Sequence, residues 1–319
     1  MLRFIVHRFF GFISIMFIVS IVIFSITRMI PGDPAAVLLG PQATLADIEA
    51  MRERLGLNQP YLVQYASFLT GLLHGDLGTS IYYHQSVMSL ILERLPNTII
   101  LGTTALAIAI TVAIPMGVLS ATKQYSLWDY GGMMVALIGV SMPVFWLGLM
   151  LVLLFSVNLG WLPATGMGSM KEGLWDFISH LILPSIALST IPMATLARIT
   201  RSSTLEVIRS DYVRTARAKG LSETVVIWKH AFRNALIPLL TVLGLQISNM
   251  LSGAVLTETI FSWPGMGRLI VDAIEKRDFV MVQGNVLFVV TIFVTVNLII
   301  DILYAVANPK ISVKSTGRE

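Results

Sequence analysis

Residues 203–238 read STLEVIRSDYVRTARAKGLSETVVIWKHAFRNALIP, and this segment decides how the chain is organised. It is the most basic stretch of a sequence that is otherwise mostly apolar, and it separates two apolar runs. At helical spacing, Tyr212 and Ala216 share an apolar face with earlier residues of the segment. Gly220 suits a helix C-terminus, and Ser222 suits the cap of a following helix. We expect a helix–glycine–helix unit on the membrane surface, because the segment is too polar to span.

Two interpretations of this segment follow from its residues. It is either an interfacial linker, whose Lys and Arg residues only set the topology of the neighbouring spans, or a docking element for a partner protein. Helical periodicity is the same in both cases and leaves the choice open.

The composition places the chain in the membrane. Of its 319 residues, 55% are hydrophobic and 13% are charged, and the mean hydropathy is +0.79. These values are typical of a polytopic membrane protein. The absence of cysteine excludes disulfides, a thiol nucleophile and thiolate metal sites. The net charge of +4 says little by itself, and we expect no nucleic-acid partner.

Six stretches are long and apolar enough to cross the ~30 Å hydrocarbon layer. They lie near residues 9–27, 98–121, 131–157, 181–201, 236–256 and 279–300. Within the third stretch, Ser141-Met-Pro143 marks either a bend or a packing contact, and packing is the preferred interpretation. Arg198 and Arg201 end the fourth stretch, where their side chains can snorkel to the interface.

The distribution of basic residues predicts the orientation. With six spans, 14 of the 22 Lys and Arg residues fall on the side of both termini and 8 on the other. The positive-inside rule then places both termini and residues 203–238 in the cytoplasm. The polar residues 31–94 lie outside, where Thr44 can cap a helix over 45–55 and Tyr61–Leu73 can form another. This segment is too short for a core of its own and should pack on the spans or on a neighbouring subunit.

The sequence offers no motif for catalysis or nucleotide binding. It lacks a G-x-x-x-x-G-K-[S/T] loop and an H-E-x-x-H pair, and its five histidines are scattered without ligand spacing. We therefore expect no catalytic residue, cofactor or metal in this chain, although a missing motif alone does not exclude an intramembrane hydrolase.

Polar residues inside a span cost free energy, so they usually face protein or water. Gln246, Asn249 and Gly253 repeat at helical spacing in the fifth span, close to Ser252. They either line a translocation pathway or hydrogen-bond neighbouring helices, which is worth about 0.6 kcal/mol per bond. Asp301 alone is thin support for a secondary transporter, the alternative from another class. A membrane scaffold without transport activity is the third possibility.

Several motifs together resemble a known family. Residues 212–220 (YVRTARAKG) and 230–238 (HAFRNALIP) are similar to the cytoplasmic loop of binding-protein-dependent ABC importer permeases. Four further motifs fall where that family has them, namely Pro31-Gly-Asp-Pro34, Gly75-Asp76-Leu-Gly78, Trp161-Leu-Pro163 and Glu258-Thr-Ile-Phe-Ser-Trp-Pro-Gly265. The resemblance covers essentially the whole chain. It is to the first, or B-type, permease subunit of the dipeptide, oligopeptide, nickel and glutathione branch.

The resemblance implies an all-α polytopic membrane protein with six transmembrane helices and the type I ABC importer permease fold. Its parts would be an N-terminal transmembrane helix (1–30), an extracytoplasmic helical segment (31–94), a five-helix permease core (95–307) and a cytoplasmic tail (308–319). The core would contain a cytoplasmic coupling loop (203–235) and an extracytoplasmic loop (257–283).

The resemblance also implies roles for particular residues. Those that would couple the loop to an ATPase are Tyr212, Arg214, Ala216, Arg217, Ala218 and Gly220. Those that would belong to the translocation pathway are Gln246, Asn249, Ser252 and Gly253. Those that would form the face toward an external binding protein are Glu258, Phe261, Trp263 and Pro264. For this last group, anchoring in the interfacial aromatic belt is an equal alternative from the sequence alone.

Partners follow from the same resemblance. It implies a second, similar permease subunit, two cytoplasmic ATPases that bind ATP and Mg, and an extracytoplasmic solute-binding protein. The assembly would lie in the bacterial inner membrane, with this chain as a multi-pass subunit. Di- or oligopeptides are the expected cargo, and nickel chelates and glutathione remain open.

Overall fold

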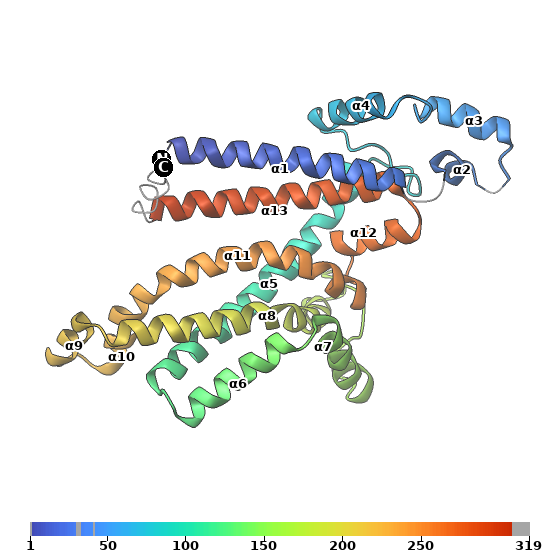
Figure 1. Cartoon of the computed structure of the whole chain (residues 1–319). Helices are drawn as coiled ribbons and strands as arrows, with labels where there is room; N and C mark the ends of the chain where they lie inside the picture. Colours follow the sequence, from blue (N-terminus) through green and yellow to red (C-terminus); the bar gives the residue numbers. More distant parts are fainter. Residues whose placement is uncertain (1, 30–32, 41, 308–319) are drawn as a thin grey trace. The chain divides into compact units, whose positions relative to one another are not determined.

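The structure is a computed structural model that describes residues 2–29, 33–40 and 42–307. These residues are mostly helical and, apart from one isolated bridge between Thr79 and Ser86, they form no strand. The chain divides into two compact units, one made of Met1–Pro96 with Gly265–Glu319 and the other of Asn97–Pro264. Figure 1 shows the helices of both units.

The first unit is built on two long helices, α1 and α13, which lie side by side (Figure 1). Its elements are α1 (Leu2–Met29), α2 (Pro34–Leu39), α3 (Leu45–Arg54), α4 (Tyr61–Leu73), the first turns of α5 (Val87–Thr122), α12 (Met266–Glu275) and α13 (Phe279–Ala307). Thr27 on α1 donates a hydrogen bond to the side chain of Gln283 on α13 at 3.1 Å. This contact satisfies polar groups of both helices at their interface.

Local capping signals explain the short helices that follow α1. The side chain of Asp33 accepts a hydrogen bond from the first turn of α2. Thr44 and Asp47 form a reciprocal capping box at the start of α3. The helices expected over 45–55 and Tyr61–Leu73 are therefore confirmed, the first of them one residue shorter than expected.

Asp278 ties the segment before α5 to the start of α13. Its buried carboxylate accepts hydrogen bonds from the Ser80 hydroxyl, the Tyr82 amide at 3.1 Å and the Met281 amide at 3.0 Å. A buried carboxylate is tolerated when it is hydrogen-bonded in this way. In the same region, the ammonium of Lys276 lies 3.9 Å from the ring centroid of Tyr82.

In the second unit, α8 is central and is packed by α6, α7 and α11. The elements are the rest of α5, α6 (Leu127–Ser141), α7 (Val144–Leu151), the π-helix η1 (Val152–Asn158), α8 (Leu174–Ile208), α9 (Asp211–Ala218), α10 (Glu223–Val225), the π-helix η2 (Val226–Ala231) and α11 (Phe232–Ile260). Gly117 of α5 and Gly139 of α6 allow close approach to α8. A Cβ added to them would lie 2.5 Å from Thr200 and 2.9 Å from Thr190, respectively.

The expected third span, residues 131–157, is broken. Its two halves, Leu127–Ser141 and Val144–Asn158, meet at an angle of 105°. Met142 has an extended backbone, and Pro143 has no amide hydrogen to continue the helix. The preference for packing over bending at this motif was therefore wrong.

Among the described residues, four helices are long and apolar enough to cross a membrane, and the bent pair would make a fifth. The four are Arg8–Met29, Val87–Thr122, Leu174–Ile208 and Phe279–Ile300. In α11, only Pro238–Ile247 counts, as a shorter apolar helix. Six spans therefore remain a prediction. The helix of the expected fourth span, α8, begins at Leu174 rather than near Leu181 and contains both Pro184 and Pro192. The expected tail at 308–319 lies outside the described residues.

Candidate functional site

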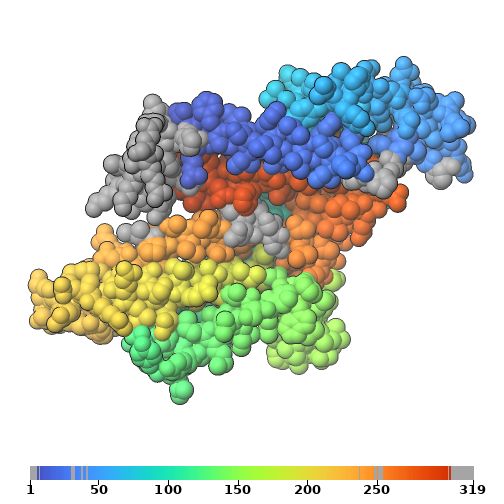
Figure 2. Space-filling model, in the orientation of Figure 1, coloured from blue at the N-terminus to red at the C-terminus, as the bar shows by residue number. Residues whose placement is uncertain are grey.

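The basic segment folds as a short helix, a glycine turn and a second helical stretch at the end of α8. α8 ends at Ile208, and Ser210 has an extended backbone before α9 begins at Asp211. Gly220 follows α9 with a φ of +76°, a left-handed conformation that glycine adopts without strain. Ser222 occupies the cap position of α10, but its side chain makes no capping hydrogen bond. In Figure 2 this loop forms the tip of the α8–α11 pair.

A small apolar core holds the loop together. Val213 and Ala216 of α9 are buried in a cluster with Val226 and Ala231 of η2. Ala216 is only 6% exposed, so its side chain packs inside the loop. The resemblance places Ala216 among the ATPase-coupling residues, but its side chain does not lie on the outer surface of the loop. A mere linker between spans needs no such core.

An ion pair closes the turn between α9 and α10. The guanidinium of Arg217 donates to the carboxylate of Glu223 through Nη2 at 2.6 Å and through Nε at 3.1 Å. These hydrogen bonds hold the pKa of Glu223 below its usual range and raise the pKa of Arg217. Arg217, which the resemblance places among the ATPase-coupling residues, is therefore engaged in an ion pair within the loop.

Tyr212 connects the loop to the start of α11. Its hydroxyl accepts a hydrogen bond from Asn234 Nδ2 at 2.7 Å, and lies 3.5 Å from the carbonyl oxygen of His230. The Trp228 and Phe232 rings meet edge to face at 5.3 Å on the same stretch. Tyr212 thus fixes α9 to η2 and α11 through hydrogen bonds in addition to the apolar core, and the two rings join η2 to α11.

The outward surface of the loop is small and basic. Arg214, Ala218 and Lys219 are exposed, as are Gly220 and Leu221. The Arg214 side chain is 78% exposed and lies 3.8 Å from the carboxylate of Asp211. A Cβ added to Gly220 would meet nothing within 4 Å. A docking partner would therefore meet two cationic side chains, Arg214 and Lys219, beside the small residues Ala218 and Gly220.

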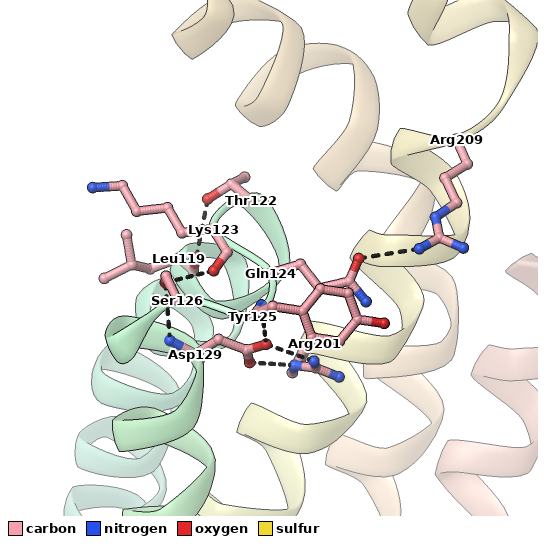
Figure 3. Close-up of polar contacts among 9 residues, drawn as sticks. All are labelled: Leu119, Thr122, Lys123, Gln124, Tyr125, Ser126, Asp129, Arg201 and Arg209. Atoms are coloured by element: carbon pink, nitrogen blue, oxygen red, sulfur yellow. Dashed lines mark hydrogen bonds and ion pairs between the residues drawn. The ribbon is translucent and has the colours of Figure 1, made fainter.

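A buried ion pair lies on α8 about two helical turns before the loop (Figure 3). Arg201 of α8 donates to the carboxylate of Asp129 on α6, from Nε to Oδ1 at 2.6 Å and from Nη2 to Oδ2 at 2.7 Å. The Asp129 side chain is 3% exposed and that of Arg201 is 24% exposed. The charge of Arg201 is therefore satisfied by a partner inside the protein, and snorkelling of Arg198 and Arg201 stays a prediction.

The turn between α5 and α6 carries further contacts to α8 (Figure 3). The Tyr125 amide donates to Asp129 Oδ2 at 3.0 Å, and Ser126 caps α6 through the Asp129 amide. Arg209, just after α8, donates to Gln124 Oε1 at 3.1 Å. The turn is thus fixed to α8 at two positions, Arg201 and Arg209, about two helical turns apart.

The predicted pathway residues are only partly described. Gln246 is buried on α11, which packs against α7 and α8. The surroundings of Asn249, Ser252 and Gly253 lie outside the described part of the structure. The pathway role of these four residues stays a prediction.

The residues expected at an external binding-protein face are mostly buried. Trp263 is fully buried, and its Nε1 donates to the backbone carbonyl of Asn97 at 2.9 Å. Asn97 Nδ2 in turn donates to the carbonyl of Pro264 at 2.8 Å. Glu258 is fully buried as well, and accepts a hydrogen bond from the Thr98 hydroxyl at 2.7 Å. These side chains fix the end of α11 to α5.

Phe261 is buried between α8 and the α7–η1 region, and its carbonyl accepts a hydrogen bond from the Gly166 amide at 2.7 Å. Pro264 is half-buried. The rings of Phe261 and Trp263 are both enclosed by the chain itself. They are therefore not exposed to a membrane interface or to a partner in this structure. Both sequence-based interpretations assumed exposed rings.

Sequence reasoning missed the role of Asp129 and the internal partner of Arg217. The pattern Ser126-x-x-Asp129 before an apolar run was a capping signal that marks the start of α6. Nothing local signalled that Arg201 would be the partner of Asp129. In the described ranges, no group of three or more His, Asp or Glu side chains is placed to hold a metal ion.

Comparison with known proteins gives two matching family descriptions. Residues 113–313 match the "binding-protein-dependent transport system inner membrane component", and residues 1–102 match the N-terminal region of such membrane components. The dipeptide transport system permease protein DppB of Alkalihalophilus pseudofirmus is 48% identical over 98% of this chain and 99% of its own length. DppB of Escherichia coli K12 and the oligopeptide permease protein AppB of Bacillus subtilis are each 43% identical, with the same coverage.

Solved structures of an ABC transporter share the fold. A chain of the inward-facing MetNI methionine ABC transporter matches with a TM-score of 0.53 and 14% identity, over 69% of this chain and 97% of that one. A second crystal form of MetNI gives a TM-score of 0.55 and 16% identity with the same coverage. At this identity the likeness shows a common fold.

Proposed function

The chain belongs to the family of binding-protein-dependent transport system inner membrane components, and from this membership we propose that it translocates di- or oligopeptides as one permease subunit of an ATP-driven importer. It is a multi-pass inner-membrane transport protein that works with other ABC components. One observation carries the peptide assignment: the proteins that resemble it over nearly their whole length are named as dipeptide and oligopeptide permeases.

The energy source lies outside this chain in our proposal. The sequence has no phosphate-binding loop, so two ATPase subunits would bind ATP and Mg and hydrolyse the nucleotide. The loop of α9 and α10 is the place where one of them docks. In support, the loop has its own core and an outward surface with Arg214 and Lys219 exposed.

Docking at this loop explains how nucleotide binding acts on the spans. Only a short turn separates α9 from α8, and α8 packs against α6, α7 and α11. A displacement of α9 therefore reaches the core of the unit through one helix. ATP shifts the equilibrium only if it binds the closed ATPase pair more tightly than the open pair. The stiff core of the loop and the Arg217–Glu223 ion pair keep the displacement from being absorbed within the loop.

The remaining partners complete the proposed machine. A second, similar permease subunit contributes the other half of the pathway, and an extracytoplasmic binding protein delivers the peptide. Both termini and the α9–α10 loop face the cytoplasm, as the excess of basic residues on that side predicts. Gln246, Asn249, Ser252 and Gly253 of α11 contribute to the pathway.

The proposal is tested by purification and uptake. The tagged chain is purified gently from its native membranes and the bound proteins are identified. A second permease and two P-loop ATPases are expected. Uptake of labelled di- and oligopeptides, a nickel chelate and glutathione is then compared in cells with and without the gene. Loss of peptide uptake alone supports the cargo. A chain that purifies alone, with uptake that survives ATP depletion, would overturn the importer assignment.

A further inference from the structure

The helix α4, residues Tyr61–Leu73, has an outer face that nothing in its own unit covers. None of its 13 residues is charged. Large apolar side chains on this helix are exposed, with Leu62 at 82% and Leu73 at 79%. In water, an apolar surface of this kind is normally buried against something.

An adjacent face of α4, with Tyr65 and Phe68, packs on a membrane-spanning helix. The Tyr65 ring meets Phe24 of α1 edge to face at 5.3 Å, and Phe68 stacks on the same Phe24 at 5.8 Å. The hydroxyls of Tyr65 and Ser20 share a hydrogen bond at 2.8 Å. Figure 2 shows α4 lying on the outer surface of α1. Tyr65 also meets the Phe17 ring at 6.5 Å, so α4 is attached along the second half of α1 rather than beyond its end.

The position of these contacts sets the depth of α4. The candidate span of α1 runs from Arg8 to Met29. At a rise of 1.5 Å per residue, Phe24 lies about 8 Å and Ser20 about 14 Å along the axis from Met29. An apolar helix lying in an interface reaches about 5–10 Å into the boundary of head groups and acyl chains. The contact at Phe24 lies within this range and the contact at Ser20 lies deeper, so α4 is held at or below the depth where lipid begins.

Two polar side chains of α4 find hydrogen-bond partners within the chain itself. Gln64 Nε2 donates to the carbonyls of Leu57 and Gln59 at 3.0 and 2.7 Å. Thr70 donates to carbonyls of its own helix. The neighbouring helix α3 differs, because it carries Asp, Glu and Arg residues and has a capped, charged surface suited to water. The change from charged to uncharged helix thus occurs at the turn between α3 and α4.

We propose that α4 is an interfacial helix whose outer face, with Leu62 and Leu73, is embedded in the lipid of the leaflet where α1 ends at Met29. The surface of α1 supports lipid as the occupant. Its exposed apolar side chains, such as Ile18 and Ile21, belong to the same candidate span on which α4 packs. A protein partner would meet a polar rim around an apolar centre, and α4 has no charged residue to provide one.

The absence of cysteine makes the test direct. Single-cysteine variants Leu62→Cys and Leu73→Cys are labelled with an environment-sensitive fluorophore in the assembled complex, in liposomes of phosphatidylethanolamine and phosphatidylglycerol. Ile18→Cys on α1 is the control for lipid, and Glu53→Cys on α3 is the matched control for water. Both control side chains are exposed, so labelling leaves the packing intact.

Quenching by nitroxide-labelled lipids and by aqueous iodide then separates the occupants. For Leu62 and Leu73 we expect blue-shifted emission and about twofold or stronger lipid quenching than for Glu53, with weak iodide quenching, because an interfacial helix buries its apolar face below the head groups. Quenching by iodide to the level of Glu53 would overturn the proposal. So would resistance to both quenchers, since it indicates a protein cover, and so would iodide quenching that disappears when a purified binding protein is added.

Discussion

Arg201 holds both carboxylate oxygens of Asp129, at 2.6 and 2.7 Å, so that a charge pair lies inside the contact between α8 and α6. Taking two charges out of water is costly, and the pair is tolerated because the geometry is bidentate and the Tyr125 amide also donates to the carboxylate. The importance of this pair is therefore revealed by removing one partner and not both.

We expect Asp129→Ala to destabilise the subunit toward the lower end of about 3–5 kcal/mol, because Arg201 loses its partner while keeping some contact with water. Thermal unfolding of the purified complex measures this loss. Arg209→Met, which removes one hydrogen bond to Gln124, is the matched control and should have little effect. The double variant Asp129→Leu with Arg201→Met should recover most of the stability. A double variant as unstable as Asp129→Ala would contradict this explanation.

Gly220→Asp should uncouple ATP hydrolysis from uptake while the chain still inserts in the membrane. Gly220 has a φ of +76° and open space around it, so the added carboxylate both strains the turn and places a negative charge on the basic docking surface. Peptide uptake and the ATPase activity of the complex are measured side by side. Gly56→Asp is the control, because Gly56 has a φ of +65° and equally open surroundings on another turn. Normal uptake at normal expression would remove the basis for coupling at this loop.

The Arg217–Glu223 pair should make the loop sensitive to acid. The folded pKa of Glu223 is lowered by hydrogen bonds from Arg217, so the pair stabilises the loop fully above the unfolded carboxyl pKa of about 4.3 and loses its effect as the pH falls through the lower, folded pKa. Because the two side chains are 38% and 56% exposed, the pair contributes only about 0.2–1 kcal/mol.

Hydrogen exchange of the loop amides, corrected for intrinsic rates at each pH, measures this contribution. Glu223→Gln should reduce protection at pH 7, and the difference from the parent should vanish below the folded pKa. A difference that persists at low pH would show that the variant acts through packing and not through charge.

Trp263→Phe should weaken the structure without weakening a binding-protein contact. The Trp263 ring is buried and its Nε1 donates to the Asn97 carbonyl, so the phenylalanine ring leaves a buried acceptor without its donor. We expect a loss of about 1–3 kcal/mol in thermal unfolding. Trp161→Phe is the control, since its ring is 67% exposed. The affinity of the complex for its binding protein should be unchanged in both variants. If only Trp263→Phe lowered the affinity for the binding protein, the assignment of Trp263 to the binding-protein face would be supported instead.

Short-range signals in the sequence were sufficient for much of the fold. Thr44 and Asp47 gave the start of α3, Gly220 gave the end of α9, and a lack of charge marked the long helices. These features depend on residues within a few positions of each other, where helix geometry is decided.

Contacts between distant residues were beyond sequence reasoning. Asp129 and Arg201 are 72 positions apart, and no local pattern connects them. The sequence around Trp263 does not distinguish an aromatic belt from a buried core, because an indole ring is common in both. For Arg217, the sequence contained the acidic partner six residues later, but helical spacing does not extend across the glycine turn that brings the two together.

The two prolines inside α8 divide it mechanically. Each removes one backbone hydrogen bond from the helix, so bending stiffness is lowest at these points. Beyond Pro192 the helix continues unbroken to Ile208, a rod of about 24 Å. When this rod rotates about Pro192, Arg201 is displaced by about half as much as Ile208, because it lies about half as far from the pivot. The ion pair to Asp129 then couples α8 to α6. A displacement at the C-terminal end of α8 moves the start of α6 in the same direction by a smaller distance.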